Sequence, residues 1–585
     1  MDHASKIREK LDLPTLISEY IPLKKVGRNF TSLCPFHNEK SPSFVVSPER
    51  QIWHCFGCGK GGDCFTFLME YENLEFIEAL RILGKKTGVQ ITGIALSGAS
   101  AIKERIFQIN NLVSEFYHYV LTQLPAGKDA MSYLVSKRKI NKRLIDSFSI
   151  GFAPRSGNAL SKYLVARKKH KAADCVEAGL AIQRGGELFD FFRGRIIFPL
   201  SDHRGNILGF SGRSLSEDGD GPKYINTRET LVYHKGEMFF GLSKAKEEIK
   251  KTGFAVVMEG EFDVISAFKE GITNAVAIKG TALTDSQALL IARFAPKVAL
   301  CLDQDAPGID ATKRSLPILE KRGLSAVVVT PPNAKDPDDA LNQNPIGFKK
   351  ALRDAPSVYD FFISYFKDKF GTDSAEGKKK ITDQILPSIA LIQNEVVKEH
   401  FLKRLSLEVD TTYESLSREL DKITKGNIAQ EEKHEVGKTK DRRQLLEEYL
   451  ISLIIQSENP RAIYDSILDF VVIYKFEQGV YQKIVENLFV YFEKNQDFDS
   501  KRFLDDLPKE LVPAFDKCFL MPIPKFEDNI KYQEEITQVA KELKGFYLRS
   551  RIKEISDKLR KKEPGSEEEA KKLRREFSEI ATQLS

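Results

Sequence analysis

Four residues near the N-terminus have the types and the spacing of a zinc site. Cys34 and His37 are separated by two residues in CPFH, and Cys55 and Cys58 by two residues in CFGC. This spacing lets both side chains of a pair converge on one ion, and a closed Cys3His set is typical of tetrahedral zinc in a structural role. Two unrelated pairs of buried small residues are a poor alternative to a zinc site. The chain has only seven cysteines in 585 residues, and three of them have this spacing. We therefore predict one structural zinc ion, with Cys64 nearby as a packed thiol outside the ligand set.

Acidic residues follow three apolar segments farther along the chain. Glu259 closes FAVVME, Asp303 and Asp305 close VALCLDQD, and KDPDDAL after AVVVTPP contains Asp336 and Asp338. In a parallel sheet the carboxyl ends of the strands meet at one edge, and residues i and i+2 of an extended chain point to the same side. Hard oxygen ligands favour Mg²⁺ or Mn²⁺, and such a site favours phosphoryl or nucleotidyl transfer. A lone Asp-x-Asp is usually a solvated turn, but the matching positions of the other carboxylates favour a metal site here.

Basic residues are interleaved with glycines and short apolar segments just upstream of these carboxylates. They could hold a nucleic-acid backbone or nucleoside triphosphates on one face of a sheet. The alternative is a solvated strand face whose charge is balanced by neighbouring acidic residues, and charge alone does not separate the two. The candidates are Arg193, Arg195, Arg213, Lys223 and Lys235.

The composition is that of an ordinary globular chain with several domains. Hydrophobic residues make up 42% and charged residues 29%, and 585 residues suffice for about three or four domains. The net charge of +6 permits nucleic-acid binding without demonstrating it. The isolated cysteines Cys175, Cys301 and Cys518 argue against a disulfide framework and indicate a reducing cytoplasm. Apolar runs such as VALCL are too short to span a membrane, so we expect no membrane partner.

Changes in residue pattern divide the chain into segments. ITGIALSGASA, near residues 92–101, and the polar stretch between 424 and 442 are typical of linkers. Apolar strands alternate with amphipathic helices after residue 250, which indicates a parallel sheet covered by helices. The predicted fold class is multidomain α+β, with an N-terminal zinc ribbon, a central mixed α/β core and a C-terminal all-α domain. The expected divisions are a zinc-binding domain at 1–95, a core at 102–424 (subdomains 102–245, 250–345 and 346–424), and a helical domain at 442–585.

Several motifs occur together in the order found in bacterial DnaG-type primases. CPFHNEKSPSF and WHCFGCGKGGD resemble the zinc-binding domain of that family. FRGRIIFPLSD, GFSGR, GPKYINTRET and YHKG resemble its basic, template-facing subdomain. MEGEFDVIS, KGTALT, LDQD and KDPDDAL resemble its Toprim catalytic subdomain, so the resemblance covers residues from about 5 to 345.

The resemblance implies an RNA polymerase that makes short primers for replication from ribonucleoside triphosphates on single-stranded DNA. Glu259, Asp303 and Asp305 would then be the catalytic, magnesium-binding carboxylates, with Asp336 and Asp338 as further magnesium ligands. Whether Glu259 is a metal ligand or a general base stays open. The basic residues above would hold the template and the incoming nucleotides. We expect a monomer in the bacterial cytoplasm at the replication fork, with a DnaB-type helicase bound by the C-terminal domain, in which no individual residue is assigned.

The chain departs from the family pattern at two places. The family often has GYMD after the glutamate, whereas residues 260–263 are GEFD, which adds a charge beside the site. The common DGD is DQD at 303–305, with proline two residues later. The carboxylates are retained in both cases, so these changes bear on the fine geometry of the loop after Asp305.

Two other functions are compatible with parts of the pattern. A Toprim nuclease or topoisomerase would need, for strand passage, a nucleophilic tyrosine that nothing in the sequence identifies. A non-enzymatic adaptor that binds DNA and a helicase would gain nothing from concentrated negative charge. In the primase reading, the zinc domain would read the template, and the residues expected to meet DNA bases and phosphates are Arg28, Phe44, Trp53 and Lys60, although some of these residues could instead pack the ribbon.

Overall fold

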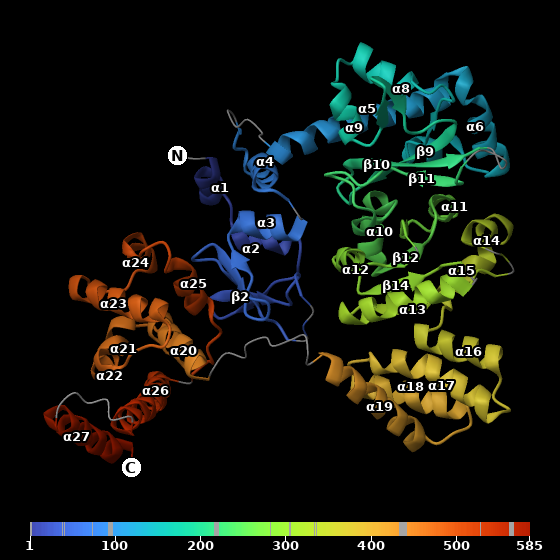
Figure 1. The fold of residues 1–585 in the computed structure, drawn as a ribbon. Coiled ribbons are helices and arrows are strands. Elements are labelled where there is room, and N and C mark those ends of the chain that lie inside the picture. The colour runs from blue at the N-terminus through green and yellow to red at the C-terminus, as the bar shows by residue number, and fades with distance from the viewer. Residues whose placement is uncertain are drawn as a thin grey trace. The chain divides into compact units, whose positions relative to one another are not determined.

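The computed structural model describes residues 3–584 except 38, 40, 73, 92–97, 216–220, 281, 304–305, 333, 335, 432–441, 527 and 561–566. The chain forms two compact units, one of Met1–Ile91 with Val436–Ser585 and one of Thr92–Glu435 (Figure 1). We call them unit 1 and unit 2. Residues 92–97 and 432–441 of the expected linkers, and Asp305, lie outside the described residues. The finer division into domains stays a prediction.

The N-terminal part of unit 1 is a five-stranded antiparallel sheet in the order β1-β2-β3-β4-β5, packed against short helices. Between the two pairs of cysteine and histidine residues, FVVS forms β3 and IWHC forms β4. Helix α4 begins with a reciprocal capping box between Glu75 and Glu78 and ends at Gly88, whose φ of 70° suits glycine. The elements are α1 (His3–Lys10), α2 (Leu13–Ser18), β1 (Lys24–Val26), β2 (Asn29–Ser32), β3 (Phe44–Ser47), β4 (Ile52–Cys55), β5 (Gly61–Gly62), α3 (Cys64–Glu72) and α4 (Phe76–Thr87).

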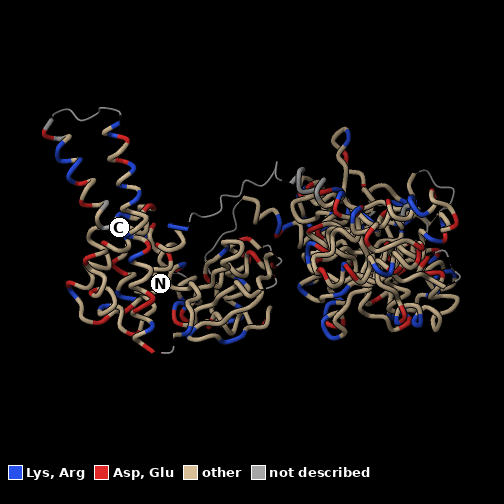
Figure 2. Tube along the Cα trace, turned by 90° about the horizontal axis from the view of Figure 1, so that it is seen from below, with Lys and Arg blue, Asp and Glu red and all other residues tan. Residues whose placement is uncertain are grey.

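The C-terminal part of unit 1 is helical, as the sequence predicts. Its core gathers around the central residues of α20, of which Leu450, Ile451 and Ile454 are fully buried. Helices α26 and α27 pack against each other and carry charges of both signs along their length (Figure 2). The helices are α20 (Arg442–Gln456), α21 (Pro460–Ser466), α22 (Leu468–Ile473), α23 (Gly479–Lys494), α24 (Ser500–Asp506), α25 (Val512–Leu520), α26 (Asn529–Arg560) and α27 (Glu567–Leu584).

The first half of unit 2 packs a long helix, α5, against an antiparallel sheet in the order β11-β10-β9-β6. Asn110 of α5 is buried and donates hydrogen bonds to two carbonyl oxygens of β10, each over 3.0 Å. Helix α5 starts at Gly98, so the end of the first expected linker is helical. The elements are α5 (Gly98–Gln123), η1 (Pro125–Gly127), α6 (Lys128–Ser132), η2 (Tyr133–Lys137), α7 (Lys142–Ser147), β6 (Gly151–Ala153), α8 (Ala159–Lys162), η3 (Tyr163–Arg167), α9 (Ala172–Glu177), β7 (Ala181–Arg184), β8 (Glu187–Asp190), β9 (Arg195–Ser201), β10 (Ile207–Ser214), β11 (Tyr224–Asn226), η4 (Lys235–Glu237) and α10 (Leu242–Thr252).

The expected parallel sheet follows, in the order β13-β12-β14-β15. Alternate residues of β12 point to opposite faces: Val256 and Met258 enter one core, and Ala255 and Val257 enter another. Burial of both faces explains why these strands are continuous apolar runs. The elements are β12 (Phe254–Met258), α11 (Glu261–Lys269), β13 (Ala275–Ala277), α12 (Asp285–Ala292), β14 (Lys297–Leu300), α13 (Ala306–Lys321), β15 (Ser325–Val328) and α14 (Pro337–Gln343).

Unit 2 ends in a helical bundle whose apolar core also includes Ile309 and Leu316 of α13 and Val328 of β15. The predicted fold class is therefore confirmed: a zinc ribbon, a mixed α/β core with a parallel sheet, and a helical C-terminal part. Within the described residues, no helix is long and apolar enough to cross a membrane. The last helices of unit 2 are α15 (Pro345–Arg353), α16 (Val358–Phe370), α17 (Ala375–Ala390), α18 (Glu395–Glu408) and α19 (Tyr413–Glu431).

Candidate active site and zinc centre

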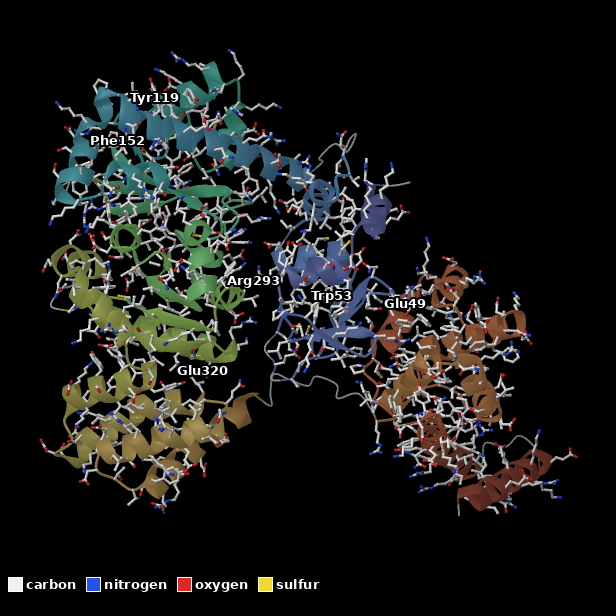
Figure 3. All side chains as sticks on the ribbon, turned by 180° about the vertical axis from the view of Figure 1, so that it is seen from behind. Glu49, Trp53, Tyr119, Phe152, Arg293 and Glu320 are labelled. Atoms are coloured by element: carbon white, nitrogen blue, oxygen red, sulfur yellow. The ribbon has the colours of Figure 1, made fainter. Side chains whose placement is uncertain are left out.

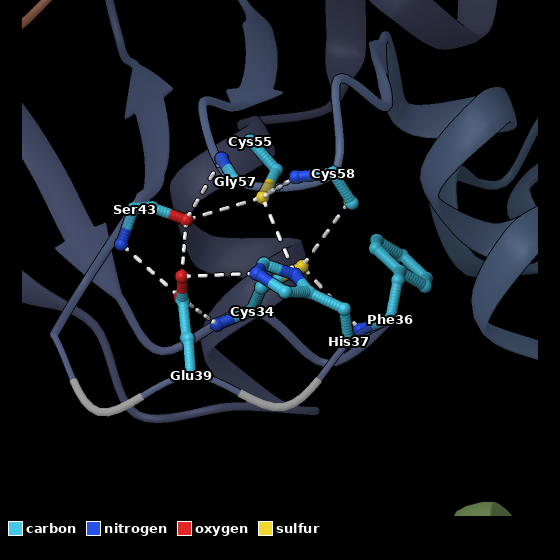
Figure 4. A network of polar contacts seen from close by, with 8 residues as sticks. All are labelled: Cys34, Phe36, His37, Glu39, Ser43, Cys55, Gly57 and Cys58. Atoms are coloured by element: carbon cyan, nitrogen blue, oxygen red, sulfur yellow. Dashed lines mark hydrogen bonds and ion pairs between the residues drawn. The ribbon is translucent and has the colours of Figure 1, made fainter. Parts of the chain in front are cut away.

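The four predicted zinc ligands converge at one end of the ribbon (Figure 4). Cys34 Sγ lies 3.9 Å from Cys58 Sγ, and Cys55 Sγ lies 3.7 Å from His37 Nδ1. Tetrahedral ligands about 2.3 Å from zinc would be about 3.8 Å apart, so the donor set fits this ion. Over the described part of the chain, this is the one group of three or more potential ligands whose donor atoms all lie within 4.8 Å of one another. Cys64 is buried outside the group, as predicted.

Glu39 supports the quartet and was not selected from the sequence. Its carboxylate lies 3.2 Å from His37 Nε2, the ring nitrogen that faces away from the cysteines. It also accepts hydrogen bonds from the backbone N–H of Cys34 over 2.7 Å and from that of Ser43 over 3.1 Å (Figure 4). A carboxylate behind a metal-binding histidine fixes the ring and its tautomer. The signal available in the sequence was an acidic residue two positions after the histidine.

The aromatic residues proposed to meet DNA are buried instead. Trp53, which is labelled in Figure 3, is 1% exposed. Phe44 is fully buried, and the two rings are stacked with their centroids 5.1 Å apart. They pack the ribbon, because strands this short need large apolar side chains to form a core. Lys60 is exposed and pairs with Glu70, and the Arg28 guanidinium lies 4.5 Å from the ring centroid of a phenylalanine in α25.

The ends of β12 and β14 bring Glu259 and Asp303 together. Val257 and Leu300 are paired in parallel register, so the residues just beyond the two strands are neighbours. The backbone N–H of Asp303 donates to Glu259 Oε1 over 3.1 Å, and both residues line a cavity of about 360 Å³. The structure thus brings together two of the predicted catalytic carboxylates, while Asp305 lies outside the described residues.

Asp263, in the first turn of α11, is a further carboxylate in this cavity that sequence reasoning missed. Its oxygens accept the backbone N–H groups of Gly260 over 2.8 Å and of Asp338 over 3.1 Å. Burial raises the pKa of Asp263 well above its ordinary value; the hydrogen bond from Gly260 opposes this, and the charges of Asp336, Asp338 and Asp303 raise the pKa further. Repulsion among hard oxygen donors is what a bound divalent cation relieves, so the residues fit such an ion.

Asp336 and Asp338 reach the same cavity from the start of α14 but have different surroundings. Asp336 caps the helix by accepting a backbone N–H of its first turn over 2.8 Å. Asp338 is 3% exposed, pairs with Arg138 and accepts a hydrogen bond from Ser266 Oγ. Protein donors therefore engage both oxygens of Asp338, and its role as a magnesium ligand stays a prediction. Arg138, which follows the π-helical turn η2, was not selected from the sequence.

Two of the predicted basic residues, Lys223 and Lys235, line the cavity with the carboxylates. Arg193 is exposed. Arg195 donates to the carbonyl oxygens of Pro222 over 3.0 Å and of Lys223 over 3.2 Å. This side chain therefore holds the segment that carries Lys223.

Arg213 does not lie on an open basic surface, in contrast to the expectation. It is 6% exposed, with its guanidinium 4.9 Å from the ring centroid of Tyr133 and 5.2 Å from that of Phe262. Aromatic residues of η2 and α11 enclose the charge, an arrangement that cation–π attraction stabilises. Its role toward template or nucleotide stays a prediction.

Glu261 and Lys279 form a buried ion pair in the wall of the cavity. Burial alone would raise the pKa of Glu261, but the charge of Lys279 and its hydrogen bond outweigh burial and hold this pKa below its ordinary value. The charge that Glu261 adds beside the site is thus compensated within the protein. Sequence reasoning missed Lys279, although it follows an apolar strand just as the acidic residues do.

Family models match the chain along most of its length. The model described as CHC2 zinc finger matches residues 2–96, and the model of the DNA primase catalytic core, N-terminal domain, matches residues 116–246. A Toprim-like model matches residues 256–341, and a model of the DnaB-helicase binding domain of primase matches residues 359–412.

Curated relatives match nearly from end to end. A DNA primase of Halalkalibacterium halodurans is 32% identical, with 94% of this chain and 95% of the relative covered. A DNA primase of Listeria monocytogenes is 31% identical, with 95% of this chain and 93% of the relative covered. The chain belongs to the bacterial DnaG-type DNA primase family. This primase is a nucleotidyltransferase, a DNA-directed RNA polymerase that makes short RNA primers for replication. A solved structure of the zinc-binding and RNA polymerase domains of the Aquifex aeolicus primase is 32% identical, covers 71% of this chain and 99% of that one, and has a TM-score of 0.48.

The matched family models also support two metal cofactors and a helicase partner. The zinc-finger model includes the quartet, in support of a structural zinc ion, and the Toprim-like model includes the strand-end carboxylates, in support of a divalent metal. The helicase-binding model supports a helicase partner for the primase, but its match lies in α16–α18 and not in residues 442–585. The contact predicted for the C-terminal helices stays a prediction.

Proposed function

We propose that primer synthesis takes place in the cavity beyond β12 and β14, on a single-stranded DNA template and with ribonucleoside triphosphates. The main observation behind this proposal is that carboxylates and lysines line the same cavity. The carboxylates are those of Glu259, Asp263 and Asp303, and the lysines are Lys223 and Lys235. Carboxylates alone would repel a triphosphate and lysines alone would repel a metal, so the combination suits a metal–nucleotide complex.

In this proposal Glu259 and Asp303, together with Asp305, hold Mg²⁺ or Mn²⁺. The metal would lower the pKa of the attacking hydroxyl and stabilise the pyrophosphate that leaves. Lys223 and Lys235 hold the phosphates of the incoming nucleotide through direct charge attraction. Asp263 restrains the turn at Gly260 through its hydrogen bond and thereby fixes the direction of Glu259.

A substitution at the shared strand edge tests this site. Asp303→Asn preserves the size of the side chain but removes its charge, so template-directed synthesis from ribonucleotides on single-stranded DNA should fall by about a hundredfold or more. Asp310→Asn, an exposed aspartate of α13, is the matched control and should leave synthesis unchanged. Circular dichroism would verify that both variants fold. Undiminished synthesis by Asp303→Asn would show that the chemistry takes place elsewhere.

We further propose that the helices of residues 442–585 bind the replicative helicase. Support comes from a groove of about 260 Å³ between α22 and α26, whose rim includes Ile473, and from the exposure of Val472 at 72% and of Ile473 at 58%. Exposed apolar side chains beside a groove make this part of the surface a candidate for binding a partner. The competing location is the segment 359–412 that the helicase-binding model matches.

A pair of variants separates the two locations. Val472→Asp combined with Ile473→Asp should leave synthesis on naked template intact but remove stimulation by the helicase. Val396→Asp, at a 76% exposed position of α18, tests the alternative. If only Val396→Asp abolishes stimulation, the helicase binds residues 359–412 and the proposal for the C-terminal helices is wrong.

A further inference from the structure

The ion pair between Glu261 and Lys279 is built by the parallel sheet itself. Met258 of β12 and Ala277 of β13 are paired in parallel register, so Glu261 and Lys279, just beyond the two strand ends, lie side by side. Lys279 Nζ donates to Glu261 Oε1, and to Ser211 Oγ of β10 over 3.3 Å. The pair thus connects the parallel sheet to the antiparallel sheet that carries the basic residues.

Stability alone does not explain this pair. The side chains of Lys279 and Glu261 are 7% and 2% exposed, and removing either charge from water has a large desolvation penalty. Neutral side chains of similar volume would pack the same wall at no such cost, and replacing a buried pair in this way is often neutral or stabilising. The reason for burying these two charged side chains is therefore expected in the cavity that both of them line.

The pairing of acidic and basic residues in this cavity provides such a reason. Asp338 pairs with Arg138, and Glu261 pairs with Lys279. Without Glu261, the ammonium of Lys279 would remain in the wall and turn toward the carboxylates that share its cavity, Glu259, Asp263 and Asp303. An ammonium held there would compete with a divalent cation for the same oxygens and repel it.

We propose that Glu261 is a positioning residue that holds the Lys279 ammonium away from the metal-binding carboxylates, so that the lysine does not weaken the affinity of the active site for its divalent cation. This inference rests on the proposed site of synthesis. The inference also gives a function to the negative charge of Glu261, which the common GYMD pattern lacks. In this chain, a lysine that follows the neighbouring strand pairs with that charge.

The test is Mn²⁺ binding by the zinc-loaded full-length chain, measured by isothermal titration, together with the Mg²⁺ concentration that half-saturates primer synthesis. E261Q should weaken Mn²⁺ binding about tenfold, because the ammonium is released. K279M should bind Mn²⁺ at least as tightly as the wild type. The charge-neutral double variant E261Q/K279M should return to within about threefold of the wild type. E408Q, at a partly exposed ion pair with Lys367, is the control and should change nothing.

The outcomes distinguish this inference from a purely structural role and from failure of the site. Equal weakening in E261Q and in the double variant would overturn the inference, because the loss would not depend on the lysine charge. Weaker binding by K279M would overturn it as well. If E261Q does not fold, E261D keeps the charge and should bind within about threefold of the wild type, and a tenfold loss would contradict the inference. Retention of Mn²⁺ binding by Asp303→Asn would instead show that the proposed metal site is wrong.

Discussion

The backbone N–H of Asp303 donates to Glu259 Oε1 over 3.1 Å, which connects the ends of two neighbouring parallel strands. Because the bond fixes the carboxylate that follows β12 against the backbone that follows β14, the spacing of these residues depends on the register of the two strands. This rigid edge is where the primase collects its acidic residues.

Glu39 should determine how tightly the primase holds zinc. Glu39→Gln removes the charge behind His37 and should weaken zinc binding by about ten- to a hundredfold, because the ring loses the carboxylate that orients it. Competition with a chromogenic chelator measures the affinity. Glu70→Gln, at the exposed pair with Lys60, is the matched control. Equal zinc retention by both variants would exclude a role for Glu39.

Arg138 should matter for stability because it compensates a buried carboxylate. Arg138→Met leaves Asp338 at 3% exposure without its cation and should lower the free energy of unfolding by about 3 kcal/mol or more. Arg353→Met breaks an ion pair that is mostly exposed and should cost less than about 1 kcal/mol. Calorimetry of the full chain measures both changes. The double variant Arg138→Met with Asp338→Asn should recover part of the loss; no recovery would mean that the charge of Asp338 is not the cause.

Gly308 should be required for the position of Asp303. A Cβ atom at Gly308 would overlap the backbone carbonyl oxygen of Asp303, so the backbone must shift at the catalytic edge. Displacement by about 1 Å can cost about a hundredfold in rate, and we expect a loss of this order in primer synthesis by Gly308→Ala. Gly479→Ala, which meets no atom within 4 Å, should be without effect. Full activity of Gly308→Ala would show that this backbone moves freely.

Glu320 should make the stability of unit 2 depend on pH. Burial raises the pKa of Glu320, and a hydrogen bond from the Tyr359 hydroxyl over 2.6 Å offsets only part of this effect (Figure 3). With its pKa higher in the folded state, Glu320 binds its proton more tightly when the chain is folded. The contribution of Glu320 to stability should therefore be lost as pH rises from the ordinary glutamate value through the folded pKa. Over this range the melting temperature of the wild type should fall more, or rise less, than that of Glu320→Gln, and identical slopes would refute the assignment.

Local spacing was sufficient to predict the zinc quartet, the parallel sheet and the edge at which Glu259 and Asp303 meet. These features depend on residues close in sequence or on the periodicity of strands, which a sequence displays directly. The same rules did not reveal which side chains become buried. Trp53 and Arg213 were expected on exposed surfaces, and each is enclosed by side chains from other elements.

Residue types and their spacing were thus enough to predict the chemical groups in this chain: a tetrahedral zinc set, strand-end carboxylates and basic residues. The pairing of the charges became visible only in the folded protein. Arg138 and Asp338 lie 200 residues apart, and Lys279 reaches Glu261 only because β12 and β13 pair in register. Which charged side chains pair depends on how the helices and strands pack together. Burial removes the water that would otherwise solvate each charge, and the nearest opposite charge takes its place.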